Sequence, residues 1–328
     1  MKYPKIICEI ASSHEGSVDD CINLIHKISE LEVDYVKFQI FDTKELISNS
    51  IVNSPLNKIY IKPESWDLII KEAFNCKLKI ICEFYDLKSV NLISNHRMID
   101  AYKIPTSDIN DFLLLDKIYA YNKTVFIGVG GALTEEINIL IDYVKKYKNE
   151  TVLLHGFQNF PTKIDDVNIV KIKWLSSTYN LDIGYADHTD SDNELRDVPS
   201  FIALALGATY IEKHISPNRF LKKSDYNSAL NPDEFKLFVS NIKKVTKMMK
   251  NSSFLALDQA EEKYRENMKK YAIAKEDIFS GQPFDINKIV FKRTLEPGIP
   301  RIFFLKRNYR AFLKNINSGC MLRDEDLG

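Results

Sequence analysis

Short apolar runs rich in β-branched residues recur eight times within the first 215 residues, and amphipathic segments separate them. Runs that are apolar on both faces are typical of parallel strands buried under helices. Eight strand–helix units in about 250 residues is the number that closes a (β/α)8 barrel, an α/β fold. The strands are predicted at residues 5–10, 35–40, 78–82, 101–104, 124–127, 151–154, 181–184 and 208–212.

The connecting segments have the periodicity of helices. Residues 18–28 place apolar side chains at i, i+3, i+4 and i+7, and Ser17 with Asp20 resembles a capping box before them. Asn231 as N-cap and Pro232 as the first helical residue open a long closing helix. A doubly wound open sheet is the competing fold, but no GxGxxG follows the first strand and no GxxxxGK[ST] occurs.

The composition changes after the predicted barrel. We expect the barrel over residues 1–250, a charged linker over 251–270 and a small β-rich domain over 271–328. In that domain, residues 272–289 align with residues 310–327 and suggest two similar strand–turn–strand units. A module of about 60 residues often needs a partner surface for stability.

The charge balance argues against some classes of partner. The chain has 45 basic and 45 acidic side chains, so no net field attracts nucleic acid. No apolar run reaches the ~18 residues of a membrane span, and no signal-peptide cleavage site precedes the first strand. We therefore expect a cytoplasmic protein without nucleic-acid or membrane partners. The five scattered cysteines suggest reduced thiols rather than a disulfide framework.

Ionisable residues gather where the predicted strands end. In a (β/α)8 barrel the chemistry lies at the C-terminal ends of the strands. Side chains alternate along a strand, so Lys37 and Gln39 share one side of the second strand. Buried charge is costly unless it is paired or used, and these residues therefore indicate a site. They are Glu9, Lys37, Gln39, Lys103, Asp108, His155, Asp187, His188, Glu212, Lys213 and His214.

Each of these groups has more than one interpretation. His188 and His214 could share a divalent cation, or they could be histidines bonded to backbone or carboxylate groups. Lys37 and Lys103 could bind an anion, or they could form salt bridges. The glycines at 128–131 could approach a phosphate, or they could form only a turn.

Several motifs follow one another along the chain, namely CEIASSHEGS, VKFQ, YKIPTSDINDFLLLDKI, LLHGFQNFPTKIDDVNI, GYADHT, GATYIEKHIS and SDYNSALNPDEF. In this order and spacing the chain resembles the sialic acid synthase family over nearly its whole length. The resemblance implies a TIM barrel followed by an antifreeze-like (SAF, β-clip) domain, which carries KRTLEPGIP. It also implies a metal-dependent transferase that condenses phosphoenolpyruvate with an N-acetylmannosamine-type acylamino-hexose, forms a nine-carbon 2-ulosonic acid and releases phosphate.

The resemblance assigns roles to individual residues. It makes His188 and His214 ligands of a divalent cation, expected to be Mn²⁺ with Mg²⁺ or Co²⁺ as alternatives, and it adds Glu9 and Asp187 to the catalytic group. Arg293 would reach the acyl-amino sugar from the neighbouring subunit in a domain-swapped homodimer. The substrate-binding residues that the resemblance implies are Lys37, Gln39, Lys103, Thr106, Asp108, Gln158, Asp225 and Arg293.

The chain also departs from the family pattern. Glu83, Gly128 and Ala186 stand where the family carries phosphate-binding Ser or Thr, and Asp108 replaces a Glu. A carboxylate about 4 Å from a phosphate costs on the order of 4 kcal/mol at an effective dielectric of 20. Glu83 must therefore turn away, pair with Lys37 or Lys103, or be protonated. A non-catalytic sugar-binding relative and a synthase with a changed donor or acceptor are the alternative functions.

Overall fold

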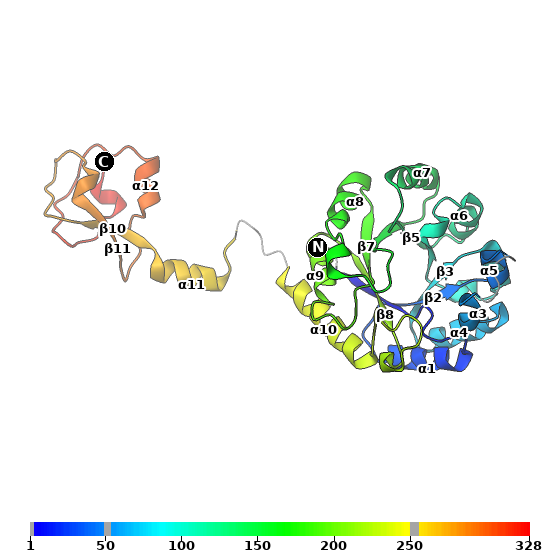
Figure 1. The fold of residues 1–328 in the computed structure, drawn as a ribbon. Coiled ribbons are helices and arrows are strands. Elements are labelled where there is room, and N and C mark those ends of the chain that lie inside the picture. The colour runs from blue at the N-terminus through cyan, green and yellow to red at the C-terminus, as the bar shows by residue number, and fades with distance from the viewer. Residues whose placement is uncertain (1–2, 49–53, 250–255) are drawn as a thin grey trace. The chain divides into compact units, whose positions relative to one another are not determined.

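The computed structural model describes residues 3–48, 54–249 and 256–328. The chain divides into two compact units, Met1–Lys250 and Asn251–Gly328. Figure 1 shows the first as a ring of helices around strands and the second as a smaller unit with a two-stranded sheet, α11 and α12. No helix in the described ranges is both long and apolar enough to cross a membrane.

The first unit is a closed (β/α)8 barrel. Its strands pair in parallel in chain order, and β1 pairs with β8 to close the ring. All eight predicted strands are confirmed. β7 and β8 each run three residues beyond the predicted end, because the apolar runs that predict them stop before the polar residues at their C-terminal ends. The strands are β1 (Lys5–Glu9), β2 (Tyr35–Ile40), β3 (Lys79–Phe84), β4 (Ala101–Ile104), β5 (Thr124–Gly128), β6 (Thr151–His155), β7 (Asp182–Asp187) and β8 (Tyr210–Ile215).

The helices begin where the capping signals predict. Ser17 Oγ accepts a hydrogen bond from the Asp20 backbone N–H at 3.1 Å and caps α1 (Val18–Ser29). Glu234 Oε2 accepts from the Asn231 N–H at 2.9 Å at the start of α10 (Pro232–Met248). The other barrel helices and the short strand that follows β8 are α2 (Thr43–Leu46), α3 (Leu56–Ile59), α4 (Pro63–Asn75), α5 (Leu87–Leu92), α6 (Phe112–Tyr119), α7 (Thr134–Val144), α8 (Lys171–Tyr179), α9 (Val198–Ala205) and β9 (Ala229–Leu230).

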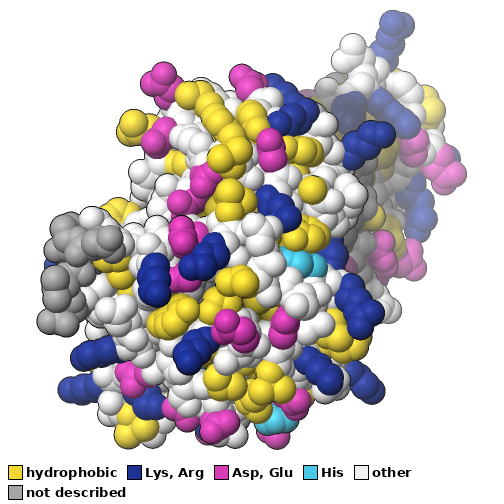
Figure 2. Space-filling view, turned by 90° about the vertical axis from the view of Figure 1, so that its right-hand side faces the viewer, with side chains coloured by type: hydrophobic (Ala, Val, Ile, Leu, Met, Phe, Trp, Pro, Cys, Tyr) yellow, Lys and Arg dark blue, Asp and Glu magenta, His cyan; other side chains and the backbone are white. Residues whose placement is uncertain are grey.

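The surface of the molecule mixes both signs of charge. On the face drawn in Figure 2, Lys and Arg side chains are interspersed with Asp and Glu, and apolar side chains lie between them. This distribution agrees with the formal net charge of zero. A mixed surface of this kind produces no extended field of one sign on that face.

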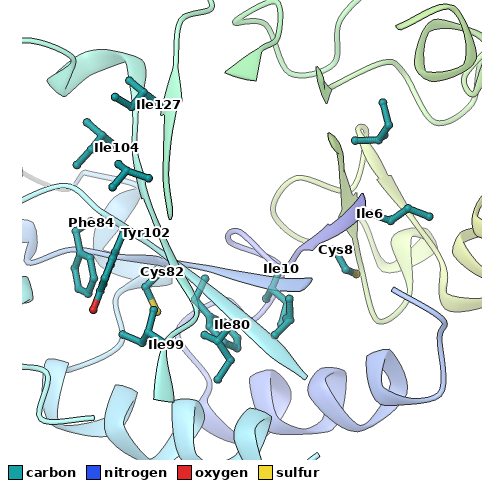
Figure 3. Close-up of a cluster of buried hydrophobic side chains, with 14 of the residues drawn as sticks. Ile6, Cys8, Ile10, Ile80, Cys82, Phe84, Ile99, Tyr102, Ile104 and Ile127 are labelled. Atoms are coloured by element: carbon teal, nitrogen blue, oxygen red, sulfur yellow. The ribbon is translucent and has the colours of Figure 1, made fainter. Parts of the chain in front are cut away.

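The barrel core has two layers that follow the alternation of side chains along each strand. Between strands and helices, a large apolar cluster includes Cys8, Cys82 and Phe84, and Figure 3 shows part of it. Inside the barrel, a smaller cluster includes Ile7, Ile81 and Phe126. A residue that lies two positions beyond an interior residue, toward the C-terminal end of the same strand, therefore also points into the barrel. This parity places Glu9 and Glu83 inside and Cys8 outside.

The contacts of the second unit follow the internal repeat, although residues 310–327 form isolated bridges instead of the predicted strands. Its strands β10 (Lys270–Ala274) and β11 (Ile289–Arg293) are antiparallel, and its helices are α11 (Gln259–Met268) and α12 (Arg301–Lys306). Ile278 and Ile316 exchange N–H···O bonds of 2.8 Å across the repeat. Ser280 N donates to Asn315 Oδ1 and Ser318 N donates to Asp277 Oδ1, each at 2.7 Å. Positions 38 residues apart thus make equivalent contacts, as two copies of one motif would.

Candidate active site

One cavity opens at the C-terminal ends of the barrel strands, directly above the apolar interior layer. It encloses about 90 Å³, and charged, amide, hydroxyl and aromatic groups share its wall. We call it the catalytic cavity. Its lining residues are Lys37, Gln39, Glu83, Tyr85, Lys103, Pro105, Thr106, Gly128, Leu154, Gln158, Phe160, Ala186, His188, Glu212 and His214.

Two buried lysines in this cavity hold three carboxylates. Lys37 Nζ lies 2.8 Å from Glu83 Oε2 and 2.9 Å from Glu212 Oε1, and it also contacts Glu9 Oε2. Lys103 Nζ lies 2.8 Å from Glu212 Oε1 and 3.5 Å from Glu83 Oε1. Lys37 is 1% exposed and Glu83 is 2% exposed. Two positive and three negative charges give this buried network a formal charge of −1.

The network resolves the question about Glu83 that the sequence raises. Burial alone would raise the pKa of Glu83, but the charges of Lys103 and Lys37 outweigh it and lower that pKa. The same two lysines lower the pKa of Glu212 against the effect of burial. Glu83 is therefore ionised and paired with both lysines, and its third partner is the Gln39 amide, which donates to Oε2 at 3.2 Å.

The two histidine rings lie beside one another, edge to face, in the wall of the cavity. The ring centroids of His188 and His214 lie 5.4 Å apart with an interplanar angle of 64°. His188 Nδ1 lies 2.9 Å from the Phe157 carbonyl oxygen, so this nitrogen carries the proton and Nε2 remains for another contact. Burial lowers the pKa of His188 to about 4 and that of His214 further. Both rings are therefore neutral near pH 7 and can act as ligands.

Thr106 adds a hydroxyl that the structure leaves unpaired. Its Oγ1 is buried and has no hydrogen-bond partner within the described ranges. A Cβ on Gly128 would lie 2.8 Å from that oxygen, so glycine at 128 lets the two segments approach closely. Ala186 and Gln158 complete this side of the wall. Glu83, Gly128 and Ala186, the three positions where the resemblance expects phosphate-binding Ser or Thr, do line the cavity, although none of them carries a hydroxyl.

Asp187 does not line the cavity, although the sequence placed it in the catalytic group. It lies between Ala186 and His188, and side-chain alternation turns it to the outside of the barrel. Its Oδ1 lies 3.1 Å from Lys213 Nζ, and its Oδ2 accepts from Ser200 Oγ at 2.6 Å. Asp187 and Lys213 therefore form a buried ion pair that ties β7 and β8 to α9.

The remaining predicted residues differ in whether they contact the charged network, line a cavity or do neither. Glu9 is buried, and its Oε1 accepts from the Ala11 N–H at 2.6 Å. Asp108 bonds to Ser107 Oγ at 2.7 Å and is not a lining residue. Asp225 lines an adjoining cavity, and Arg293 is an exposed residue at the end of β11 in the second unit. The structure thus groups Lys37, Gln39, Lys103, Thr106, Gln158, His188 and His214 around one space, and Glu9 contacts Lys37 behind the lining residues.

The sequence treated Glu212 only as a rim charge, but the structure makes it a bridge between the two lysines. Glu212 lies two residues before His214, so strand parity would have placed both on one face, as it did for Lys37 and Gln39. Tyr85 and Phe160 were also missed as lining residues. Tyr85 follows Glu83 by two residues and has the same signal, whereas Phe160 lies in a loop where no periodicity applies.

Comparison with known proteins gives consistent matches. N,N'-diacetyllegionaminic acid synthase of Campylobacter jejuni is 29% identical over 344 aligned positions, which cover 99% of each chain. Pseudaminic acid synthase of the same species is 26% identical and covers 98% of this chain and 96% of that protein. A solved sialic acid synthetase from Leptospira borgpetersenii has a TM-score of 0.72 at 24% identity, over 81% of this chain and 92% of that one, and shares the fold. A family model described as the NeuB family matches residues 24–254. The chain therefore belongs to the NeuB family.

Proposed function

We propose that the protein condenses phosphoenolpyruvate with an open-chain acylamino-hexose to give a nine-carbon 2-ulosonic acid and inorganic phosphate. The observation that carries this proposal is the convergence of two buried ammonium groups and two neutral imidazoles on one cavity. The reaction class is supported by the names of the relatives, which are legionaminic and pseudaminic acid synthases.

The donor side of the cavity is the wall formed by β2, β3 and β4. Phosphoenolpyruvate carries a phosphate and a carboxylate, and buried anions need opposite charge and hydrogen-bond donors. Lys37 and Lys103 supply the charge, and the Thr106 hydroxyl is an unused donor. To bind phosphoenolpyruvate, Lys37 and Lys103 must give up part of their contact with the Glu83 carboxylate. Glu83 is therefore the main obstacle to donor binding.

The histidine pair fits a divalent cation. His188 keeps Nε2 available because its Nδ1 is bonded to Phe157, and His214 Nδ1 is buried without a partner among the described residues. We therefore propose that His188 and His214 hold a divalent cation, Mn²⁺ first and Mg²⁺ or Co²⁺ as alternatives. When bound, such an ion supplies polarisation of the acceptor aldehyde.

The reaction then balances as follows. C3 of phosphoenolpyruvate forms the new bond to the aldehyde carbon, and the aldehyde oxygen takes a proton to become a hydroxyl. Water adds at C2, the bond from C2 to the phosphate oxygen breaks, and a keto acid and phosphate result. Lys37 and Lys103 offset the donor's negative charge throughout. Glu212 Oε2 is buried without a hydrogen-bond partner in the described ranges and can accept a hydrogen bond from the added water.

Release of inorganic phosphate from phosphoenolpyruvate tests the proposal. N-Acetylmannosamine and a 2,4-diacetamido-hexose would be offered as acceptors, with and without Mn²⁺. We expect phosphate release that requires a sugar and the metal. No release with any acceptor, under conditions where the protein is folded and binds Mn²⁺, would contradict the proposal.

A second candidate function follows from Glu83. Because its carboxylate occupies both lysines, the cavity could bind a neutral or cationic group instead of a phosphate. The protein would then be a non-catalytic sugar-binding relative or a synthase with a changed donor or acceptor. Sugar binding without phosphoenolpyruvate binding, measured by calorimetry, would favour this alternative.

A further inference from the structure

A second cavity adjoins the catalytic cavity, and Phe160 lines both. It encloses about 580 Å³ and is bounded by the loop after β1, by α3 and by the loop after β8. We call it the lysine-lined cavity, after Lys58, Lys222 and Lys223 in its wall. The catalytic cavity is smaller than the roughly 300–1,000 Å³ typical of small-molecule sites, so a donor and a hexose together need this second space.

The cations of this cavity are available for a ligand. Within the described ranges, the ammonium groups of Lys58 and Lys222 make neither an ion pair nor a hydrogen bond, and both side chains are exposed. Lys223 pairs at 3.1 Å with Asp20, which lies outside the cavity. Unpaired lysines that share a concave wall attract anions.

The two acids of the cavity wall bond to backbone N–H groups rather than to these lysines. Glu15 Oε1 accepts from the Ser224 N–H at 3.0 Å, and Asp225 Oδ2 accepts from the Ser12 N–H at 2.9 Å. These bonds join the loop after β1 to the loop after β8. The carboxylates therefore help to build the cavity wall, and within the described ranges neither forms an ion pair with Lys58 or Lys222.

The backbone around the cavity is held in a rare conformation. Glu15, Lys222 and Asp225 have φ angles of 46°, 52° and 61°. Left-handed conformations are costly for residues other than glycine, and they cluster at binding and catalytic sites. Gly16, at φ 78°, packs so closely on α3 that a Cβ would lie 2.7 Å from the Lys58 carbonyl oxygen. The loop after β1 is thus fitted against the segment that carries Lys58.

We propose that the lysine-lined cavity receives the end of the acceptor farthest from its aldehyde, and that Lys58 and Lys222 select acceptors with an anionic group at C6. The inference rests on the proposed function, because the proposed function places the acceptor aldehyde at His188 and His214. The Phe160 ring lies 4.3 Å from the His188 ring and lines both spaces, so a sugar that starts at His188 extends past Phe160. A phosphate ester and a uronic carboxylate share the required chemistry.

Direct binding distinguishes these acceptors. Calorimetry without phosphoenolpyruvate would compare N-acetylmannosamine, N-acetylmannosamine 6-phosphate and N-acetylmannosaminuronic acid on the full chain with Mn²⁺. We expect at least one of the two anionic sugars to bind about tenfold more tightly than the neutral one, because each charge-assisted contact adds affinity. Which of the two binds more tightly identifies the anionic group as phosphate or carboxylate.

Substitution of each lysine tests whether Lys58 and Lys222 cause the preference for anionic over neutral sugars. Lys58→Gln and Lys222→Gln should each reduce the preference for the anionic sugar and leave the affinity for N-acetylmannosamine within about twofold. Lys145→Gln, which removes an exposed lysine after α7, is the matched control and should change nothing. Equal affinity for all three sugars, or a preference that survives both substitutions, would overturn the inference.

The two proposals fail in different ways. If phosphate is released with neutral and anionic sugars at equal efficiency, the lysine-lined cavity has no selective role and the synthase reaction stands. If the anionic sugar binds more tightly through Lys58 and Lys222 but no sugar supports phosphate release, the cavity assignment stands and the synthase reaction is wrong.

Discussion

At the scale of single residues, Glu83 decides how the donor can bind. Its carboxylate lies 2.8 Å from Lys37 and 3.5 Å from Lys103, where an anionic substrate would seek the same two cations. Both lysines would keep a counter-charge without Glu83, because Glu212 contacts each of them. Replacing Glu83 therefore leaves no buried lysine unpaired, and the consequences for the donor can be measured.

We predict that Glu83→Thr binds phosphoenolpyruvate more tightly, by about tenfold or more, because one repulsive charge is removed and a hydroxyl donor is gained. Calorimetry measures the affinity, and Glu83→Gln separates the loss of charge from the gain of the hydroxyl. Unchanged or weaker binding would mean that Glu83 serves the true substrate, and that phosphoenolpyruvate is not the donor.

The histidine pair leads to a second prediction at this scale. His188→Asn should abolish high-affinity Mn²⁺ binding, observed by electron paramagnetic resonance, and chelation of the wild-type protein should stop turnover until Mn²⁺ is returned. His26, Glu72 and Cys76 also offer ligand atoms within 4.8 Å of one another on the outside of the barrel. The experiment therefore uses a Cys76→Ser background. Full Mn²⁺ binding by His188→Asn would show that the pair is not the site.

At the scale of secondary-structure elements, Asp187 and Lys213 connect β7 and β8 to α9. Both side chains are 0% exposed, and Ser200 on α9 donates to the same carboxylate. Removing one member of a buried ion pair leaves the other charge unpaired in the interior, which is far more costly than losing the attraction itself.

We predict that Asp187→Ala lowers the free energy of unfolding by about 3–5 kcal/mol. The Mn²⁺ affinity of the folded fraction should change little, because the side chain points away from the catalytic cavity. Urea unfolding measures the loss, and Asp142→Ala, in the exposed pair with Lys145, is the control that should have little effect. A stable Asp187→Ala protein that has lost only catalysis would restore Asp187 to the catalytic group.

At the scale of the whole molecule, buried histidines link stability to pH. Burial lowers the pKa of His14 and of His155 to about 4, whereas an unfolded histidine titrates near 6.5. Between these values the unfolded chain binds more protons than the folded one. Stability is therefore present above about pH 6.5 and is lost as the pH falls toward 4.

We predict that the urea midpoint, measured in chelator, falls between pH 7 and pH 5. The variant His155→Asn should fall less steeply, because one buried imidazole no longer has to remain neutral. The exposed His26→Asn is the matched control and should follow the wild type. A midpoint that is constant over this range would show that burial of these histidines does not control the stability.

We also propose that the second unit works in trans, with Arg293 contributing to the barrel of a second copy in a homodimer. Co-expression of Lys103→Ala with Arg293→Ala tests this arrangement. If Arg293 acts on the partner's barrel, mixed dimers regain one intact site, and random pairing should give about a quarter of wild-type activity. No recovery, or full activity in a monomer, would contradict the arrangement.

Much of the fold could be read from local pattern. The eight apolar runs and the capping residues Ser17 and Asn231 predict the elements, since strand and helix periodicity depend on neighbours in the chain. The same alternation predicts that Lys37 and Gln39 face one side. Applied to β7 and β8, it also turns Asp187 outward, away from the catalytic cavity, and Glu212 inward, among the charges that indicate the site.

The pairing of the charges is decided only by the closed barrel. Glu83 lies 46 residues from Lys37 along the chain, and Glu212 lies 175 residues from it. The ring closure of β1 against β8 brings these strands around one interior. Sequence establishes that ionisable side chains face inward, but which carboxylate meets which lysine depends on the register of β3 against its neighbours β2 and β4 for Glu83, and on closure of the ring for Glu212. The amino-acid sequence alone therefore determines the elements and the inward faces, whereas the tertiary structure decides that Glu83 is charged, paired and placed where a donor anion must compete with it.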